Sequence, residues 1–207
     1  MGPRARGLGA AHAQRRTEMA DAVLAIVAER GLSAVSLAEV AARAGVSGGR
    51  VQHYFGTKQE LIEAAFLRAN ELASDRIDVH PGADSPGGAL RVVLTELIPH
   101  DEPTALHMRV RQSFTALALA DEAIAARLRE DYARLHRRLA ELVAAEQAGG
   151  NIAEGVDPYA AAVALVALTE GLAYYVLIGV RLEQDARDAV LAAIAELGPT
   201  SPLGGPR

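Results

Sequence analysis

Hydrophobic positions recur every three or four residues along most of this 207-residue chain. Val23, Ile26 and Val27, for example, share one face of a helix that stops at Gly31. No stretch shows the two-residue alternation of a half-buried strand. The pattern predicts helices over residues 15–30, 36–45, 47–55, 57–79, 89–98, 103–120, 121–148, 157–181 and 184–197. We therefore expect an all-α fold of about nine helices.

Two capping boxes mark helix starts in the first third of the chain. Ser36 is followed three residues later by Glu39, and Thr57 is followed in the same way by Glu60. In a capping box, the Ser or Thr oxygen and the Glu carboxylate satisfy backbone amides that the first helical turn leaves without partners. The chain therefore begins with a group of short helices that have well-defined ends.

Residues 80–88 contain two prolines and three glycines, and they form the clearest linker in the chain. They divide the sequence into an amino-terminal head over residues 1–79 and a larger helical domain over residues 80–207. Residues 1–14 show no hydrophobic periodicity, so we expect a flexible arm before the first helix. The Gly- and Pro-rich end of the chain is expected to be loose as well.

The segment 159–180 is apolar on all sides, and Glu170 is one of its two polar residues. Roughly 20 apolar residues are enough to span a bilayer. A carboxylate at mid-span costs on the order of 3 kcal/mol, however, and the segment is rich in Ala rather than Leu and Ile. A soluble helix of this kind must be covered on every side. Because Ala160, Ala164 and Gly171 allow close approach, we favour a helix packed in its own subunit on one face and against a second copy on the other, with no membrane.

Charge is distributed unevenly along the chain. The formal net charge is −5, yet residues 1–60 hold eight Lys and Arg against five Asp and Glu. A basic head on an acidic body suits a chain that meets a polyanion at one end only. The start of the chain lacks the apolar core of a secretory signal, so we expect a cytoplasmic protein.

Residues 36–55 have the features of a helix-turn-helix. Gly45 supplies the turn, because glycine adopts a positive φ at little cost. Ala41 lies one helical turn earlier, where a small side chain lets the second helix cross close over the first. The apolar seam between the two helices consists of Val40, Ala44, Val46, Val51 and Phe55. The second helix of such a pair fits the major groove of DNA.

The polar face of that second helix carries groups that can recognise bases. Arg50 can donate two hydrogen bonds to guanine N7 and O6, and Gln52 can pair similarly with adenine. For Arg50, a phosphate contact or a solvated side chain is the alternative. Gly48 and Gly49 lack bulk, which lets the backbone approach DNA closely.

Four stretches agree in residue type and spacing with a known pattern: Ala28-Glu-Arg-Gly31, Ser36-Leu-x-x-Val-Ala-x-x-Ala-Gly-Val-Ser47, His53-Tyr-Phe55 and Thr57-Lys58-x-x-Leu61. Through them, residues of about 17–66 resemble the DNA-binding head of the tetracycline-repressor (TetR) family. Two positions depart from the usual pattern. Gln52 stands where the family often has a phosphate-binding Tyr, and Arg50 stands where it often has Thr, so the target sequence need not be the usual one.

The resemblance implies an all-helical homodimer whose last two helices, 157–181 and 184–197, make a four-helix bundle with those of the partner. It also implies repression at a palindromic operator in double-stranded DNA, relieved when a small-molecule effector enters the carboxy-terminal domain. For His53, it favours a phosphate contact over an ordinary surface or core position. The expected DNA-binding residues are Ser36, Ser47, Gly48, Gly49, Arg50, Gln52, His53, Tyr54, Thr57 and Lys58.

Helix-terminal amides and charge can hold phosphates at Ser36, Thr57 and Lys58. Four further arginines precede or open the first helix: Arg4, Arg6, Arg15 and Arg16. They are most simply a solvated arm, and insertion into the minor groove is the alternative.

Candidate ligand contacts are large or polar residues on helices expected to line the second domain. They are Phe66, His107, Met108, Arg111, Phe114, Tyr132, Glu170 and Tyr174. Ordinary core packing is the alternative for each aromatic residue. Glu170 needs a partner in its apolar helix, which can be Arg111, a ligand or a second subunit, unless it faces solvent.

Catalysis finds little support in the sequence. The chain has no cysteine, which excludes a thiol nucleophile and Cys-based metal ligation. The histidines are scattered, and a solvated Glu96–His100 pair is favoured over a metal-binding one. We therefore expect a DNA-binding regulator with no enzymatic activity, cofactor or metal. The alternative is a ligand-binding helical protein or enzyme whose head no longer binds DNA specifically.

Overall fold

The structure is a computed structural model that describes residues 4–199, with side chains described from residue 11 onward. Within that part of the chain all regular structure is helical, as the pattern predicted. The α-helices are α1 (Arg4–Arg30), α2 (Leu37–Arg43), α3 (Gly48–Tyr54), α4 (Lys58–Asp78), α5 (Pro86–Thr95), α6 (Glu102–Ala118), α7 (Glu122–Ala148), α8 (Pro158–Leu177) and α9 (Glu183–Ala195). Two 3₁₀ turns, η1 (Leu32–Ala34) and η2 (Pro81–Ala83), join them.

The chain forms two compact units. Unit 1 comprises residues 1–74 and 109–125, and unit 2 comprises residues 75–108 and 126–207. Residues 109–125 therefore group with the head, whereas the sequence placed them in the second domain. An aromatic contact joins the two stretches of unit 1: Phe114 of α6 stacks on Phe66 of α4 with ring centroids 4.4 Å apart.

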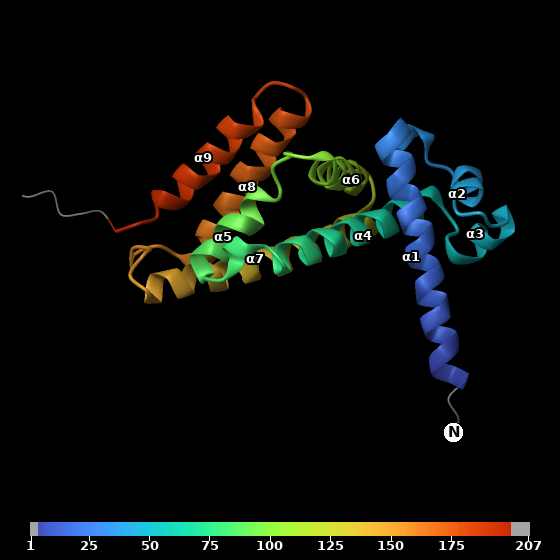
Figure 1. Ribbon diagram of the computed structural model, residues 1–207, viewed down its shortest axis with the longest axis horizontal. Helices are drawn as coiled ribbons and strands as arrows, with labels where there is room; N and C mark the ends of the chain where they lie inside the picture. Colours follow the sequence, from blue (N-terminus) through green and yellow to red (C-terminus); the bar gives the residue numbers. More distant parts are fainter. Residues whose placement is uncertain (1–3, 200–207) are drawn as a thin grey trace, which may run out of the picture. The chain divides into compact units, whose positions relative to one another are not determined.

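In unit 1, α2 and α3 lie beside each other and α2 packs on α1 (Figure 1). Ile26 of α1, Val51 of α3 and Leu61 of α4 are fully buried and join the helices in one core. Their removal from water is the main stabilising contribution here, at about 1.5–3 kcal/mol per side chain. This core holds α3 with its polar face outward.

Helix α1 begins at Arg4, not near residue 15 as the periodicity predicted. Ala, Arg and Gln, which favour helix, fill most of residues 5–16, and they do so without an apolar face that a periodicity search would detect. Residues 4–14 thus belong to a helix and not to the flexible arm that we expected. Residues 1–3, the side chains of Arg4 and Arg6, and the loose tail expected over 200–207 lie outside the described part.

In unit 2, α5, α8 and α9 pack together around a core that includes Leu90, Ile98 and Val190. Helix α5 begins at Pro86, within the predicted linker. Its start is a Ser-Pro pair, in which the Ser85 hydroxyl accepts from Gly88 N at 3.1 Å and proline occupies the first helical position. The linker before α5 is correspondingly shorter than predicted.

Helix α8 has one buried and one exposed face, although both are apolar. The buried side chains are Ala161, Ala162, Leu165, Val166, Thr169, Leu172 and Ala173. Ala160, Ala164 and Gly171 lie on the exposed face. Among the described residues, α8 is the one helix that is long and apolar enough to cross a membrane, with 39% of its most apolar window buried. Core helices of soluble proteins pass the same test.

Candidate DNA-binding and ligand-binding sites

The turn between α2 and α3 is a Schellman motif. Val46 N donates to Ala41 O at 3.0 Å, and Gly45 N donates to Ala42 O at 3.4 Å, with Gly45 at a φ of 64°. The Ser47 hydroxyl then caps α3 by accepting from Arg50 N at 3.2 Å. The predicted glycine turn and cap are therefore present, and they fix the direction in which α3 leaves α2.

Helix α3 presents to solvent the side chains that the sequence assigned to DNA. Gly48, Gly49, Arg50, Gln52 and His53 are all exposed, while Val51 between them is fully buried. A β-carbon added at either glycine would meet no atom within 4 Å, so the start of the helix is open space. Neither glycine carries a side chain that would keep a DNA backbone away from this end of α3.

The capping residues of α2 and α4 are partly occupied by the protein itself. The Ser36 hydroxyl accepts from Glu39 N at 3.2 Å, and the Thr57 hydroxyl accepts from Glu60 N at 3.2 Å. Glu60 also accepts from Gly56 N at 3.0 Å. The hydroxyl hydrogens of Ser36 and Thr57, together with the exposed Lys58, are the groups that can donate to a phosphate.

Ion pairs tie α2 to α1. Arg43 Nη2 lies 2.5 Å from Glu29 Oε1, and Arg30 pairs with Glu39. The hydrogen bond from Arg43 holds the pKa of Glu29 below its usual range. Since these pairs are exposed, they orient the helices more than they stabilise them.

Residues that the sequence did not assign to the site hold the end of α3 in place. Arg16 Nη1 donates to Tyr54 O at 3.0 Å, and the Arg16 guanidinium lies 4.5 Å from the centre of the Phe55 ring. The His12 ring lies 4.5 Å from the Tyr54 ring, which also meets His53 edge-on at 5.4 Å. These contacts join segments far apart in the sequence, so no local motif could have revealed them.

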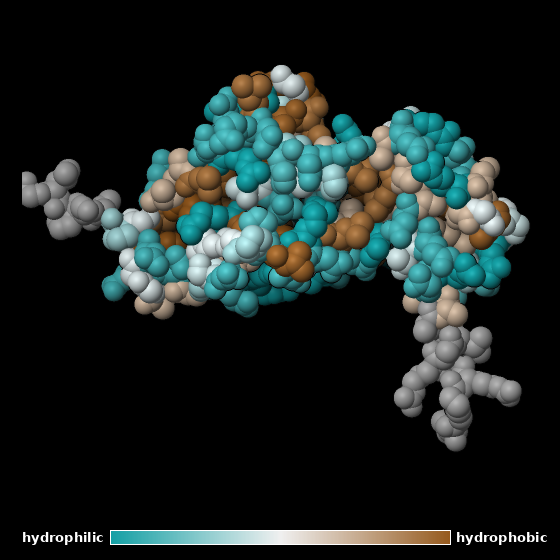
Figure 2. All heavy atoms as spheres, in the orientation of Figure 1, coloured by the Kyte–Doolittle hydropathy of each residue, from teal (hydrophilic) through white to brown (hydrophobic). Residues whose placement is uncertain are grey.

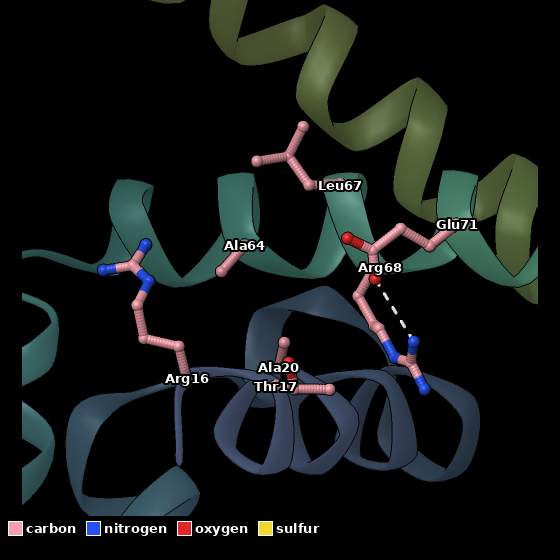
Figure 3. Close-up of a pocket in the computed structure, with 7 residues that line it drawn as sticks. All are labelled: Arg16, Thr17, Ala20, Ala64, Leu67, Arg68 and Glu71. Atoms are coloured by element: carbon pink, nitrogen blue, oxygen red, sulfur yellow. Dashed lines mark hydrogen bonds and ion pairs between the residues drawn. The ribbon is translucent and has the colours of Figure 1, made fainter. Parts of the chain in front are cut away.

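A small hollow also lies between α1 and α4 in unit 1, lined by Arg16 and Thr17 on one side and by Leu67 and Arg68 on the other (Figure 3). Its volume is about 120 Å³. Arg68 is engaged there, because Asp21 accepts from its Nε at 2.8 Å and this bond raises the pKa of the guanidinium. The hollow is a gap between two packed helices and not a cavity that would hold an organic ligand.

A larger groove, of about 420 Å³, runs between α7 and α8 in unit 2. The Tyr132 hydroxyl donates to Glu170 Oε2 at 2.6 Å. The Tyr132 ring stacks on His136 with centroids 5.7 Å apart, and His136 meets Tyr159 edge-on at 6.0 Å. One carboxylate and three rings thus line the groove, with Arg129 also at its wall.

Two of the eight expected ligand contacts, Tyr132 and Glu170, line this groove. In unit 1, Arg111 is buried with its guanidinium carbon 5.9 Å from the centre of the Phe66 ring, next to the Phe66–Phe114 stack. Three more of the expected residues, Phe66, Arg111 and Phe114, thus come together within unit 1.

The other three expected contacts are His107, Met108 and Tyr174. His107 and Met108 are buried on α6. Tyr174 is 47% exposed and lies beside Tyr175 on the outer face of α8, with ring centroids 6.3 Å apart. A role of Tyr174 in ligand binding stays a prediction.

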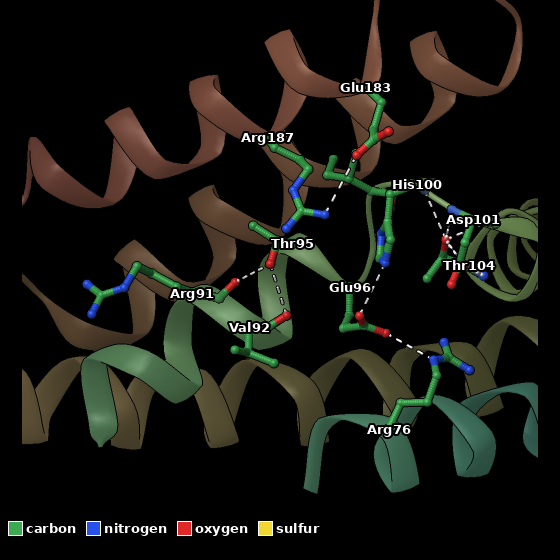
Figure 4. A network of polar contacts seen from close by, with 11 residues as sticks. Arg76, Arg91, Val92, Thr95, Glu96, His100, Asp101, Thr104, Glu183 and Arg187 are labelled. Carbon is green, nitrogen blue, oxygen red and sulfur yellow. Dashed lines mark hydrogen bonds and ion pairs between the residues drawn. The ribbon is translucent and has the colours of Figure 1, made fainter. Parts of the chain in front are cut away.

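A polar network surrounds the end of α5 (Figure 4). Glu96 Oε2 accepts from Arg76 Nε at 3.1 Å, and Glu96 Oε1 lies 3.6 Å from His100 Nε2. Asp101 caps α6 by accepting from Thr104 N at 2.8 Å and from the Thr104 hydroxyl at 2.6 Å. Burial raises the pKa of Asp101, but these hydrogen bonds outweigh it and lower the pKa overall. Among the described residues, no group of three His, Asp or Glu side chains could hold a metal ion.

Comparisons with known proteins match both parts of the chain. A family model for bacterial regulatory proteins of the tetR family matches residues 20–65. A second, for the carboxy-terminal domain of BetI-type transcriptional repressors, matches residues 86–199. This chain belongs to the TetR family. TetR-family homologues are named as transcriptional regulators and not as enzymes, in agreement with the prediction from sequence.

One TetR-family relative is the HTH-type transcriptional regulator PksA of Bacillus subtilis, 35% identical over 108 residues. These residues are 52% of this chain and 53% of PksA, so the match spans about half the length of the relative. The likeness supports membership of the family and does not transfer the relative's targets.

Solved TetR-family structures share the fold over most of the chain. One assigned to the family, from Rhodococcus sp., has a TM-score of 0.79 at 28% identity and covers 90% of this chain and 100% of that one. A transcriptional regulator from Saccharomonospora viridis, solved in complex with choline, has a TM-score of 0.75 at 22% identity and covers 88% and 96%. The second likeness shows the fold alone.

Proposed function

We propose that this chain is a homodimeric repressor that occupies a palindromic operator and leaves it when a small molecule binds the carboxy-terminal domain. The observation that carries the proposal is the exposed face of α3, which follows a rigid glycine turn and combines two glycines with Arg50 and Gln52. Few structural roles explain a surface helix that begins with two glycines, since glycine disfavours helix.

Within this proposal, base recognition belongs to α3 and phosphate contacts to its surroundings. Arg50 reads guanine and Gln52 reads adenine in the major groove. Ser36, Ser47, Thr57 and Lys58 hold phosphates through hydroxyl and ammonium donors. His53 and Tyr54, at the end of α3, add further backbone contacts.

The exposed face of α8 supports a homodimer. Leu168, Tyr175 and Ile178 are exposed by 39%, 47% and 54%, respectively. Apolar side chains also reach the surface at the turn from α8 to α9, where Val180 and Leu182 are exposed (Figure 2). Apolar surface of this extent on a helix usually marks an interface. A two-fold axis would bring α8 and α9 against the same helices of a second copy.

The α7–α8 groove supports a small organic cation as effector. Ring faces carry negative potential, and the Glu170 carboxylate adds negative charge to the same space, which Arg129 at the wall partly offsets. A choline complex is described for a regulator of the same fold. Choline is therefore the first probe to test. Since the operator is chromosomal, we expect the protein to act in the cytoplasm.

The operator is tested by selecting sites from a random-sequence duplex library with the full chain. We expect enrichment of a two-fold symmetric site whose half-sites lie about one helical turn, or a multiple of it, apart. Competition against random DNA across a salt series then measures specificity. If no site is enriched and the affinity equals that for random DNA at every salt concentration, the repressor proposal fails. A ligand-binding protein or enzyme with an inactive head then replaces it.

The effector site is tested by calorimetry with choline and with its neutral isostere 3,3-dimethyl-1-butanol. We expect choline to bind and the isostere to bind at least tenfold more weakly, because only choline carries the charge. Glu170→Gln removes the carboxylate charge and should abolish that preference. The matched control is Glu141→Gln, at an exposed position on α7. Equal binding of both probes, or unchanged binding to Glu170→Gln, contradicts a cation site in this groove.

A further inference from the structure

The amino-terminal half of α1 leaves the core of unit 1 (Figure 1). Side chains of residues 11–16 are all exposed, and the first buried one is Met19. Residues 4–16 contain four arginines and no Asp or Glu. Ala, Arg and Gln favour helix here, but the segment has no apolar face that could pack on the core of unit 1.

Contacts from two residues hold this basic helix beside the recognition helix. His12 lies on the Tyr54 ring, and Arg16 donates to Tyr54 O while covering the Phe55 ring. Tyr54 is the last residue of α3, and Phe55 is its C-cap. The basic segment is therefore held beside the C-terminal end of α3, the helix proposed to face DNA. A freely solvated arm would make no such contacts.

We propose that residues 4–16 of α1 form a second DNA-contacting element, which holds phosphates of the duplex next to the groove that α3 enters. This inference rests on the proposed operator binding. At 1.5 Å per residue the 13-residue segment is about 20 Å long, enough to reach across a groove to the neighbouring strand. It adds charge where the head meets the polyanion.

The helical state selects phosphates over bases as the target. An α-helix with its side chains is about 10 Å wide, whereas the minor groove of B-DNA is about 6 Å wide. The segment cannot enter that groove as a helix, so its arginines meet the phosphate rims. Arg15 is engaged with Glu18, with Nη1 to Oε2 at 2.6 Å. The test is therefore directed at Arg4 and Arg6.

The experiment compares Arg4→Gln/Arg6→Gln with Arg91→Gln/Arg137→Gln, which loses the same charge at exposed positions of unit 2. Affinity for a random-sequence 60-bp duplex and for the selected operator is measured from 50 to 200 mM salt. Each phosphate contact contributes about 0.9 to the slope of log affinity against log salt. Loss of two contacts lowers the slope by about 1.8 per protomer, and the affinity loss at 50 mM is then about tenfold larger than at 200 mM.

A third variant, His12→Ala, tests the positioning role of the ring contact. It keeps every arginine, and we expect it to lose part of the slope and to narrow the hydroxyl-radical footprint. An unchanged slope and footprint in Arg4→Gln/Arg6→Gln overturns the inference, as does an equal change in the control variant. Because the random duplex needs no operator, this outcome is distinct from failure of the repressor proposal, which shows as absence of an enriched site.

Discussion

The head and the α8–α9 pair differ in the polarity of their exposed surfaces. In α3, Val51 is buried, whereas the glycines and polar side chains around it are exposed. This face of the helix therefore needs no second chain to cover it. In α8, exposed Leu168, Tyr174 and Ile178 lie opposite an equally apolar buried face. A polar exposed face suits water and a charged ligand, whereas an apolar exposed face suits another protein surface. In the proposed function, the polar surface of α3 meets DNA and the apolar surface of α8 meets a second copy of the chain.

The largest effect is expected from a charge on the exposed face of α8. Ala164→Glu places a carboxylate in the proposed interface twice, once from each subunit. Burying such charges without partners costs at least about 3 kcal/mol, so the dimer should weaken at least about 100-fold. Sedimentation equilibrium measures this, and circular dichroism checks that helix content is kept. Ala144→Glu, at an exposed position of α7, is the matched control. A dimer of unchanged affinity in Ala164→Glu would move the interface to another surface.

The next effect concerns α3. Arg50→Ala should weaken operator binding by about 1–3 kcal/mol and relax the preference at one base pair. Lys58→Ala should weaken all sequences alike, because a phosphate contact carries no base information. Fluorescence anisotropy on operator and random duplexes separates the two. If Arg50→Ala loses the same affinity on both, its role is to contact phosphate.

A smaller effect is expected at the turn. Gly45 has a φ of 64°, where a β-carbon is strained, so Gly45→Ala should destabilise the head by about 1–2 kcal/mol. Gly48→Ala has no such strain and meets open space, so it should change stability by less than about 1 kcal/mol. Urea unfolding measures both. Equal stability of the two variants would mean that the turn does not constrain the head.

The smallest effect is expected at the cap of α6. Because the pKa of Asp101 is lower in the folded than in the unfolded chain, its ionised form stabilises the fold above the ordinary aspartate range. That contribution is lost as the pH falls through the lowered pKa. Asp101→Ala should cost about 1 kcal/mol at pH 7 and less at pH 3, measured by thermal unfolding. Asp84→Ala, in an exposed loop, is the matched control for the loss of one carboxylate.

Local signals predicted much of the head. Both serine caps, the capping threonine and the glycine turn are where the sequence placed them, because each acts within four residues along the chain. The reciprocal half of the second capping box differs by one residue, since Glu60 accepts from Gly56 N and not from Thr57 N. Ser85 also signalled a helix start, but the glycines around it indicated a linker instead.

Helical periodicity could not predict the start of α1, because residues 4–16 have no apolar stripe to detect. Nor could it predict that Arg16 and His12 hold the end of α3 across some forty residues of sequence. The candidate ligand residues show the same limit. Residue type selected eight of them, but only the packing of helices joins Tyr132 to Glu170 and Phe66 to Phe114.

The sequence by itself determined the helical class, the helix-turn-helix and its family, since these depend on propensity, capping and spacing between near neighbours. The tertiary structure alone decided which face of α8 is covered, which side chains line the groove and what supports the recognition helix. Those features depend on contacts between helices distant in sequence. Such contacts follow from how the apolar faces are buried together, and no short stretch of sequence records that.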